Sequence, residues 1–137
     1  MTCMVQDKAG YIWIGTEFGL NKFDGYRFTN YLHTDADSMS IPNNIIVSLF
    51  VDKEGNIIVG TTKGLAKYNN AANNFEKFKM PLGVQPRISE IMQLHDGTVV
   101  VGTEGYGLLK LDFKSMKMIQ INRKESNISY VKIILTL

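Results

Sequence analysis

The stretch GYIWIGTEFGLNKFDGYRF occupies residues 10–28, and two later stretches repeat its pattern. The second begins at Gly55 as GNIIVGTTKGLAKYN, and the third begins at Gly97 as GTVVVGTEGYGLLKLD. In each copy an apolar run leads to a Gly-Thr pair, and a Gly-Leu pair and a lysine follow. Self-similarity at a fixed period marks a repeat architecture, so three copies of one structural unit are predicted.

The three copies align position by position. The glycines of the Gly-Thr pairs lie 45 and then 42 residues apart, a spacing typical of a propeller blade. An aspartate precedes the first turn glycine of each copy. The expected structural positions of the repeat are Gly15, Gly60 and Gly102; Leu20, Leu65 and Leu108; and Asp7, Asp52 and Asp96. We expect one repeated structural role for each of the three sets, with the aspartates bonding turn amides.

The second copy shows best what one unit contains. Residues 44–52, NIIVSLFVD, are rich in β-branched and aromatic residues and end at a turn, as a strand does. The next strand, NIIVGTT, has contiguous apolar residues, which indicates a strand buried on both faces. LAKYN and FEKF complete a four-stranded antiparallel meander, the blade of a β-propeller.

The predicted fold is therefore all-β, a partial β-propeller. Its three blades are expected over residues 1–31, 44–79 and 87–122, and residues 127–137 are expected to form the first strand of a fourth. Pro42, Pro81 and Pro86 all lie in the polar links between blades, where prolines interrupt no sheet. No helical period is found in the sequence.

The shared string, D-x-x-G-x-[IV]-x-[IV]-G-T-x-x-G-L-x-K, resembles the two-component regulator propeller repeat. The resemblance implies the periplasmic sensor region of a hybrid two-component system of the kind found in gut Bacteroidetes. Such regions respond to carbohydrate breakdown products and are followed by a membrane helix and a histidine kinase. It therefore implies a non-catalytic sensory segment, a periplasmic location and an oligosaccharide ligand.

This sequence departs from the family pattern in three ways. It holds only about three blades, its third copy carries an extra residue in EGYG (residues 104–107), and its third turn reads HDG. No kinase or receiver is present, so the signalling output is expected from elsewhere in a parent protein. Two alternatives stay open: a fragment of a propeller-type lyase or hydrolase, and a truncated gene product without a function of its own.

Composition excludes several other classes. Fifteen basic residues against 13 acidic ones give a net charge of +2, too mild for a nucleic-acid partner. No apolar run approaches the roughly 20 residues that span a bilayer, so this segment is expected to make no membrane contact. The N-terminus lacks the basic and apolar regions of an export signal, and the single cysteine cannot form an intramolecular disulfide.

Few residues are candidates for chemistry. His33 and His95, the only histidines, hold different repeat positions and show no metal-ligand spacing. We therefore predict no catalytic residue, no metal and no cofactor. Lys22, Lys67 and Lys110 recur in register and suggest an anion-binding ring, although a position along the blade surface with the ammonium in water is favoured.

Trp13 and Tyr106 are the candidate ligand contacts. Trp13 is the only tryptophan, and an exposed ring can stack on a sugar, but its counterparts Ile58 and Val100 favour packing between blades. Tyr106 is the inserted residue of the third copy and has no counterpart, so a surface position is the alternative. The expected macromolecular partners are the remaining blades of the parent or, through exposed apolar faces, a second copy of this chain.

Overall fold

The computed structural model describes residues 1–121, which form three four-stranded antiparallel sheets. The first contains β1 (Cys3–Gln6), β2 (Ile12–Thr16), β3 (Gly19–Phe23) and β4 (Phe28–Tyr31). The second contains β5 (Ile46–Val51), β6 (Ile57–Thr61), β7 (Gly64–Asn69) and β8 (Asn74–Lys77). The third contains β9 (Ile88–Gln93), β10 (Val99–Thr103), β11 (Gly107–Asp112) and β12 (Lys117–Gln120).

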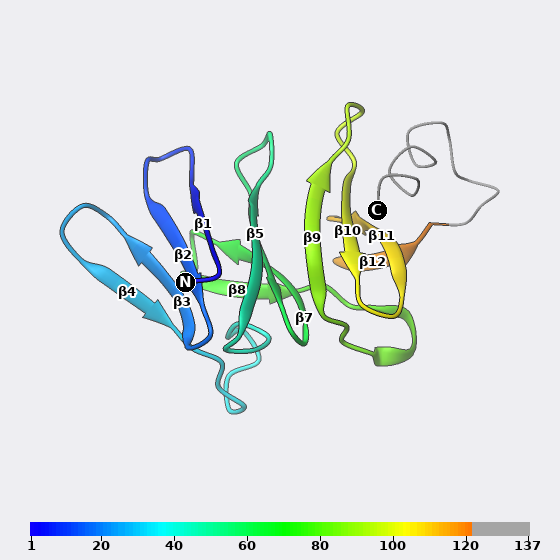
Figure 1. The fold of residues 1–137 in the computed structure, drawn as a ribbon, viewed down its shortest axis with the longest axis horizontal. Coiled ribbons are helices and arrows are strands. Elements are labelled where there is room, and N and C mark those ends of the chain that lie inside the picture. The colour runs from blue at the N-terminus through cyan, green and yellow to red at the C-terminus, as the bar shows by residue number, and fades with distance from the viewer. Residues whose placement is uncertain (122–137) are drawn as a thin grey trace.

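The three sheets follow one another as propeller blades do. Each is a simple meander in chain order, and the sheets stand side by side, with the first strands β5 and β9 adjacent at the centre of the view (Figure 1). β1 lies against β5, and β5 lies against β9. In the described part of the chain the one helix is the three-residue 3₁₀ helix η1 (Pro81–Gly83). The prediction of about three four-stranded blades is confirmed, whereas the strand expected over residues 127–137 lies outside the described residues.

The glycine of each Gly-Thr pair lies opposite the repeat leucine. Gly15 pairs with Leu20 across the β2–β3 ladder, and Gly60 pairs with Leu65 across β6–β7. A Cβ on Gly15 would lie 2.6 Å from Cγ2 of Ile46, which belongs to the first strand of the next blade. The glycine therefore provides the space into which the following blade packs.

Gly60 repeats this arrangement with the third blade. Its Cβ would lie 2.8 Å from Cγ2 of Ile88 and would also collide with the Ser48 hydroxyl of its own blade. Gly102 pairs with Leu108 in the same ladder position, but a Cβ there would meet only the Cβ of Glu90, at 3.8 Å. Gly102 differs because the described residues place no later blade against it.

The threonine of each Gly-Thr pair closes the turn that follows. Its hydroxyl donates to the carbonyl of the next repeat glycine, at 2.8 Å from Thr16 to Gly19 and 2.9 Å from Thr61 to Gly64. Both glycines have a φ near +108°, a left-handed conformation that side chains disfavour. The Gly-Thr and Gly-Leu pairs are thus two halves of one hydrogen-bonded turn.

The repeat aspartates open the first hairpin of a blade in two cases. The Asp7 carboxylate accepts a bond from the N–H of Tyr11 at 2.9 Å, and the Asp52 carboxylate accepts one from the N–H of Asn56 at 2.7 Å. The main chain of each aspartate also pairs with the same partner residue. These bonds close the turn and hold its far end in register.

The third blade differs from the expected register at this point. Leu94 makes the corresponding main-chain bonds, donating to the carbonyl of Thr98 and accepting from the N–H of Gly97. Asp96 lies two residues later and accepts from the N–H of Thr98 at 2.9 Å, which holds its pKa below the usual value. The predicted equivalence of Asp96 with Asp7 and Asp52 is therefore wrong, because the HDG turn places its aspartate next to the glycine.

Two apolar clusters fill the spaces between blades. The first joins Trp13 and Leu20 of the first blade to Val59, Tyr68 and Phe75 of the second. The second joins Ile58 and Leu65 of the second blade to Ile88, Val99 and Leu109 of the third. Burial of each large apolar side chain contributes about 1.5–3 kcal/mol, so these interfaces are a main source of stability.

The link after the second blade also reaches the third. Lys79 forms a parallel bridge with Lys117 of β12, donating its N–H to the carbonyl of Met116 at 2.8 Å and accepting from Met118 at 2.7 Å. The outer edge of the third blade is thereby tied to the chain that leaves the second. The link therefore adds main-chain bonds to an interface that also holds hydrogen bonds from Ser48 to Ile88 and from Lys53 to Gln93.

Candidate functional site

A cleft of about 630 Å³ opens between the first and second blades. Its walls come from the β1–β2 turn, the β5–β6 turn and the β7–β8 turn, together with side chains of β3 and β7. Both blades contribute charged and aromatic groups, among them Asp7, Tyr11, Lys22, Glu54, Lys67 and Tyr68. A concave site with a few convergent polar groups is the usual form of a small-molecule site.

The ammonium of Lys22 lies among aromatic rings at the base of this cleft. Its Nζ is 4.6 Å from the centroid of the Tyr11 ring and 5.5 Å from the centroids of Trp13 and Tyr68. A cation over a ring face is attracted by the ring's electron density, so the side chain is held in place. The stem of Lys22 thus lies along aromatic rings of both blades, and the favoured position of its ammonium in water stays a prediction.

The Asp7 carboxylate fixes the aromatic wall of the first blade. One of its oxygens accepts from the N–H of Tyr11, and the other accepts from Nε1 of Trp13 at 2.8 Å. Both oxygens are thus used inside the protein. Asp7 thereby fixes the Trp13 ring and the main chain of Tyr11, which carry two of the three rings near Lys22.

The wall from the second blade carries Lys67 at the register position of Lys22. Its cross-strand neighbour is Glu76, whose carboxylate accepts a bond from Nδ2 of Asn69 at 3.1 Å. Within residues 1–121 neither Lys22 nor Lys67 has a carboxylate within ion-pairing distance. Lys67 shares its sheet face with Ile58, opposite the face of Tyr68, so the side chains of Lys22 and Lys67 extend from the same face of successive blades.

A tyrosine pair lies at the same interface. The hydroxyls of Tyr31 and Tyr68 both donate to Oδ1 of Asn73, at 2.7 and 2.8 Å. Tyr31 also packs edge-on against Phe75, with ring centroids 5.2 Å apart. Burial, followed by the hydrogen bond with Tyr68, raises the pKa of Tyr31 well above its usual value.

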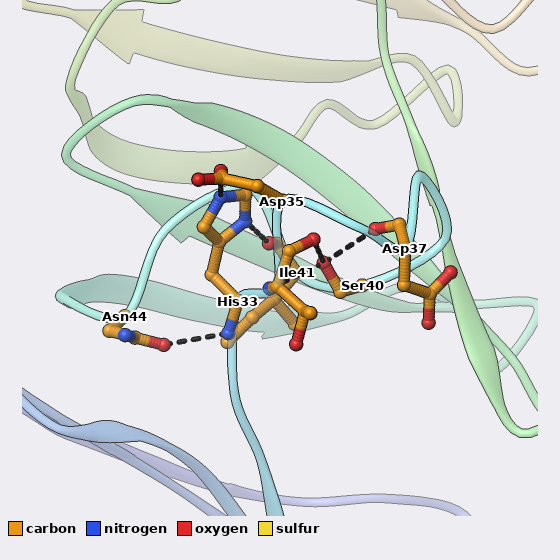
Figure 2. Close-up of polar contacts among 7 residues, drawn as sticks. His33, Asp35, Asp37, Ser40, Ile41 and Asn44 are labelled. Atoms are coloured by element: carbon orange, nitrogen blue, oxygen red, sulfur yellow. Dashed lines mark hydrogen bonds and ion pairs between the residues drawn. The ribbon is translucent and has the colours of Figure 1, made fainter.

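The link between the first two blades holds a second polar network, shown in Figure 2. Nδ1 of His33 lies 2.7 Å from the carbonyl oxygen of Ile41, and Nε2 lies 2.8 Å from Oδ1 of Asp35. The main-chain N–H of His33 donates to Oδ1 of Asn44 at 2.7 Å. Since both ring partners are acceptors, the ring makes both bonds at once only when both nitrogens carry a proton.

This network has the form of a structural clamp. The Ser40 hydroxyl lies 2.8 Å from the carbonyl oxygen of Asp37 and 3.1 Å from that of Thr34, two acceptors for its one proton, and it accepts from the N–H of Thr34. It makes no hydrogen bond with His33, so the pair lacks the contact by which a histidine activates a serine. The bonds join the two ends of the link and fix its path.

The two predicted ligand contacts occupy different surroundings. Trp13 is 0% exposed and packs between blades, so it offers no free ring face, although Lys22 connects it with the cleft. Tyr106 is 40% exposed in the β10–β11 turn of the third blade and does not line the cleft. A role of either residue in ligand binding stays a prediction.

The cleft itself was not predicted from the sequence. In the sequence Tyr11 is part of an apolar run, and Lys22 and Lys67 stand out only as recurring positions. The signal that the sequence offers is that both lysines stand two positions after the repeat leucine. That recurrence gives no information on which neighbouring blades share a cleft.

Two absences hold for the part of the chain that the structure describes, residues 1–121. No group of three or more histidine, cysteine or acidic side chains is arranged there to hold a metal ion. None of the helical structure there is long and apolar enough to cross a membrane.

Part of the chain matches the family model of the two component regulator propeller, over residues 1–18 and 40–63. These segments are the start of the first blade and the start of the second. The predicted resemblance to the two-component regulator propeller family is thereby confirmed, and it rests on the same Gly-Thr repeats.

Among relatives, histidine kinase P4 of Formosa agariphila is 56% identical over 36 residues. That match covers 26% of this chain and 3% of the relative. The chain thus matches a very small part of the relative's length.

Among solved structures, the chain is similar to the extracellular domain of BT3049 from B. thetaiotaomicron, which is described as a hybrid two component system. The TM-score is 0.74 at 28% identity, over 88% of this chain and 18% of that one. PorZ of Porphyromonas gingivalis, a surface component of the type-IX secretion system, has a TM-score of 0.65 at 15% identity, over 93% of this chain and 21% of that one. The second likeness shows the fold alone, and the chain spans about a fifth of each structure.

Proposed function

We propose that this chain is a non-catalytic segment of the extracellular sensor region of a hybrid two-component system, and that it responds to a carbohydrate breakdown product. The observation that carries the proposal is the likeness to the BT3049 extracellular domain over 88% of the chain. The short match to a histidine kinase supports the same class of parent protein. The same likeness supports a periplasmic or outer-surface location.

The chemistry of the cleft supports a carbohydrate ligand. A sugar presents many hydroxyls, and the cleft offers carboxylate, ammonium and amide groups beside two tyrosines. Its volume, about 630 Å³, lies within the range of small-ligand sites, roughly 300–1,000 Å³. A mono- or disaccharide is the size of ligand that fits.

Further blades of a parent protein are the proposed partners of the first blade. The upstream face of that blade carries Met4, Ile12, Ile14, Phe23 and Phe28, which share one side of the sheet by register with Gln6, Asn21 and Asn30. The corresponding side chains of the second blade are Leu49, Ile57, Val59, Tyr68 and Phe75, all packed against the first blade. The upstream face is thus the surface that a preceding blade covers.

The test is a binding screen of the 137-residue chain against neutral and acidic oligosaccharides, read by isothermal titration calorimetry. We expect at least one to bind, and the bound sample to return the sugar unchanged after incubation. Turnover of the sugar would contradict the non-catalytic role. Absence of binding by every saccharide would contradict carbohydrate sensing by this segment.

A further inference from the structure

The fourth strand forms the outer edge of each blade, and the three edges differ in what covers them. In the second blade the N–H of Phe75 on β8 donates to the carbonyl of Met39 in the preceding link, at 2.9 Å. In the third blade the N–H of Met118 on β12 donates to the carbonyl of Lys79 in the preceding link, at 2.7 Å. Both edges are thus covered by main chain from the link before the blade, which leaves fewer unpaired edge groups.

The edge of the first blade, on β4, lies open (Figure 1). Phe28 pairs with Phe23 across β3–β4, at the register that Phe75 has in the second blade and Met118 has in the third. Within residues 1–121 no link carbonyl accepts from the N–H of Phe28. The Phe28 side chain is 65% exposed, whereas Phe75 and Met118 are each 1% exposed. The first blade therefore lacks both the main-chain partner and the apolar cover that the other two have.

The two links that cover an edge share a sequence feature. One or two residues after the bonded carbonyl, each has a buried apolar residue followed directly by a proline, Met80-Pro81 in one link and Ile41-Pro42 in the other. Ile41 packs in the same apolar cluster as Phe75, and Met80 packs in the same cluster as Met118. The residue before a proline favours an extended backbone, and proline has no N–H to pair, so the dipeptide suits the end of a short strand-like segment.

The inner side of the upstream face has a second unused group. On β9, Gln93 donates its Nε2 to the carbonyl of Gly97, and its Oε1 accepts from the N–H of Lys53 in the hairpin turn of the preceding blade. Gln6 of β1 has the same register and also donates its Nε2 within its own hairpin, to the carbonyl of Gly10. The Oε1 of Gln6 has no donor within residues 1–121. It is therefore available to a hairpin of a preceding blade.

We infer that the open edge of the first blade binds an extended main-chain segment with an apolar-proline pair, which is the link of the blade that precedes it in a parent protein. Phe28 donates its N–H to a carbonyl of that segment, and the apolar residue covers the Phe28 ring. Gln6 accepts from the main-chain N–H of the preceding blade's first hairpin. This inference rests on the proposed function, in which further blades cover the upstream face, and it names the contacts that select them.

A second copy of this chain is a poorer source of the segment. Both links within residues 1–121 already cover their own blades through Met39 and Lys79, so neither is free to pair with Phe28 of another copy. A second copy can still meet the upstream face through apolar side chains. Such a contact would leave the Phe28 N–H without a link carbonyl.

The test supplies the segment on the full chain. A copy of residues 44–87, which is the second blade with its following link, is placed directly before Met1, so that Met1 takes the place of Ile88 after the link. Residues 24–31 stay unique in the sequence, so hydrogen–deuterium exchange at Phe28 can be read by mass spectrometry with fragmentation that resolves single N–H groups. We expect the Phe28 N–H to exchange about tenfold or more slowly than in the 137-residue chain, because hydrogen bonding protects it. Exchange at the rate of the 137-residue chain would overturn the inference.

The matched control carries Met80→Asp in the added copy only. This variant keeps the link carbonyls and removes the apolar residue before the proline, while the native blades are unchanged. We expect Phe28 to exchange in it about as fast as in the 137-residue chain. Equal protection of Phe28 with methionine and with aspartate would show that the apolar-proline pair does not select the segment, and would overturn that part of the inference.

Gln6→Leu tests the hairpin contact in the same way. In the 137-residue chain the variant loses only the bond to Gly10, whereas in the extended chain it also loses the contact with the added hairpin. We expect it to lower the thermal midpoint of the extended chain more than that of the 137-residue chain. Equal decreases in the two chains would contradict the role given to Gln6.

The outcome at the edge is separate from the outcome of the saccharide screen. Phe28 shares its sheet face with Phe23, whereas Lys22 and Tyr11 of the cleft lie on the opposite face of the first blade. Failure of every saccharide contradicts carbohydrate sensing and leaves a protected Phe28 standing. An unprotected Phe28 overturns the edge inference and leaves carbohydrate sensing by the cleft untouched.

Discussion

At the scale of single residues, the Gly-Thr glycines give the sharpest prediction. Alanine at Gly60 would place its Cβ 2.8 Å from Ile88 and against the Ser48 hydroxyl, inside a packed interface. Overpacking of this kind typically costs about 1–3 kcal/mol. We therefore expect Gly60→Ala to lower the free energy of unfolding by that amount, measured by urea denaturation followed through Trp13 emission.

Gly102→Ala is the matched control at the same repeat position. Its Cβ has 3.8 Å to the nearest side chain, and alanine in a strand costs less backbone entropy than glycine. We expect a change of about 0.5 kcal/mol or less. Equal destabilisation by the two variants would show that the glycines are needed for some other reason than the following blade.

Tyr31 predicts how stability changes at alkaline pH. Its pKa is raised in the folded protein, mainly by burial, while the unfolded chain releases the proton near pH 10. Below that pH the Tyr31 hydroxyl is protonated in both the folded and the unfolded state, and its contribution to the free energy of unfolding is complete. Above it the unfolded state loses the proton first, so stability falls as pH rises.

The test of this sign compares wild type with Tyr31→Phe between pH 8 and 11. The variant loses the hydrogen bond to Asn73 but has no hydroxyl to titrate. Its thermal midpoint is expected to fall less steeply with pH than that of wild type. Parallel slopes would show that Tyr31 makes no contribution to alkaline unfolding.

At the scale of elements, the link between the first and second blades depends on one histidine. The His33 ring bonds to Ile41 and Asp35, and its N–H bonds to Asn44. Loss of the ring removes its contacts with the Ile41 carbonyl and the Asp35 carboxylate, and a hydrogen bond of this kind contributes about 0.5–1.5 kcal/mol net. We expect His33→Ala to loosen the link and speed chymotryptic cleavage after Leu32 and Met39.

His95→Ala is the control for this prediction. His95 is exposed in the β9–β10 turn, and its replacement is expected to leave the cleavage pattern and rate unchanged. If both variants are cut at the wild-type rate, the ring of His33 does not hold the link closed.

The same scale shows what sequence can and cannot predict. The strands and turns can be predicted from Gly15, Gly60 and the apolar runs before them, because the same residues form the same strand and turn in each blade. The predicted position of Asp96 is wrong, because the HDG turn has its aspartate next to the glycine. Leu94 therefore takes the main-chain bonds that Asp7 and Asp52 make in the other blades. The cleft depends on Lys22 and Tyr68 coming from different blades, and no local pattern predicts that proximity.

At the scale of the whole molecule, the upstream face of the first blade predicts self-association. On this face Phe28 is 65% exposed and Met4 is 57% exposed. The equivalent face of the second blade is packed against the first blade. Contiguous exposed apolar surface drives association in water. We expect the 137-residue chain to form dimers or larger species at micromolar concentration, measured by analytical ultracentrifugation.

Substitutions within and outside the upstream face test whether self-association uses this face or any exposed apolar side chain. Met4→Glu combined with Phe28→Lys is expected to give a monomer. Phe18→Ser removes an aromatic ring that is 81% exposed in the β2–β3 turn, away from the upstream face, and is expected to leave the association unchanged. A monodisperse wild-type monomer would show that the exposed face does not bind a second copy.

The contacts of Gly15 and Gly60 with an isoleucine of the next blade bear on how repeat genes gain or lose blades. Ile46 sits against Gly15, and Ile88 sits against Gly60, so both junctions use the same pair of residue types. Deletion of residues 44–85 would bring Ile88 into the place of Ile46. Unequal recombination between repeats can therefore remove or add a whole blade while the new junction inherits a glycine and an isoleucine that already fit.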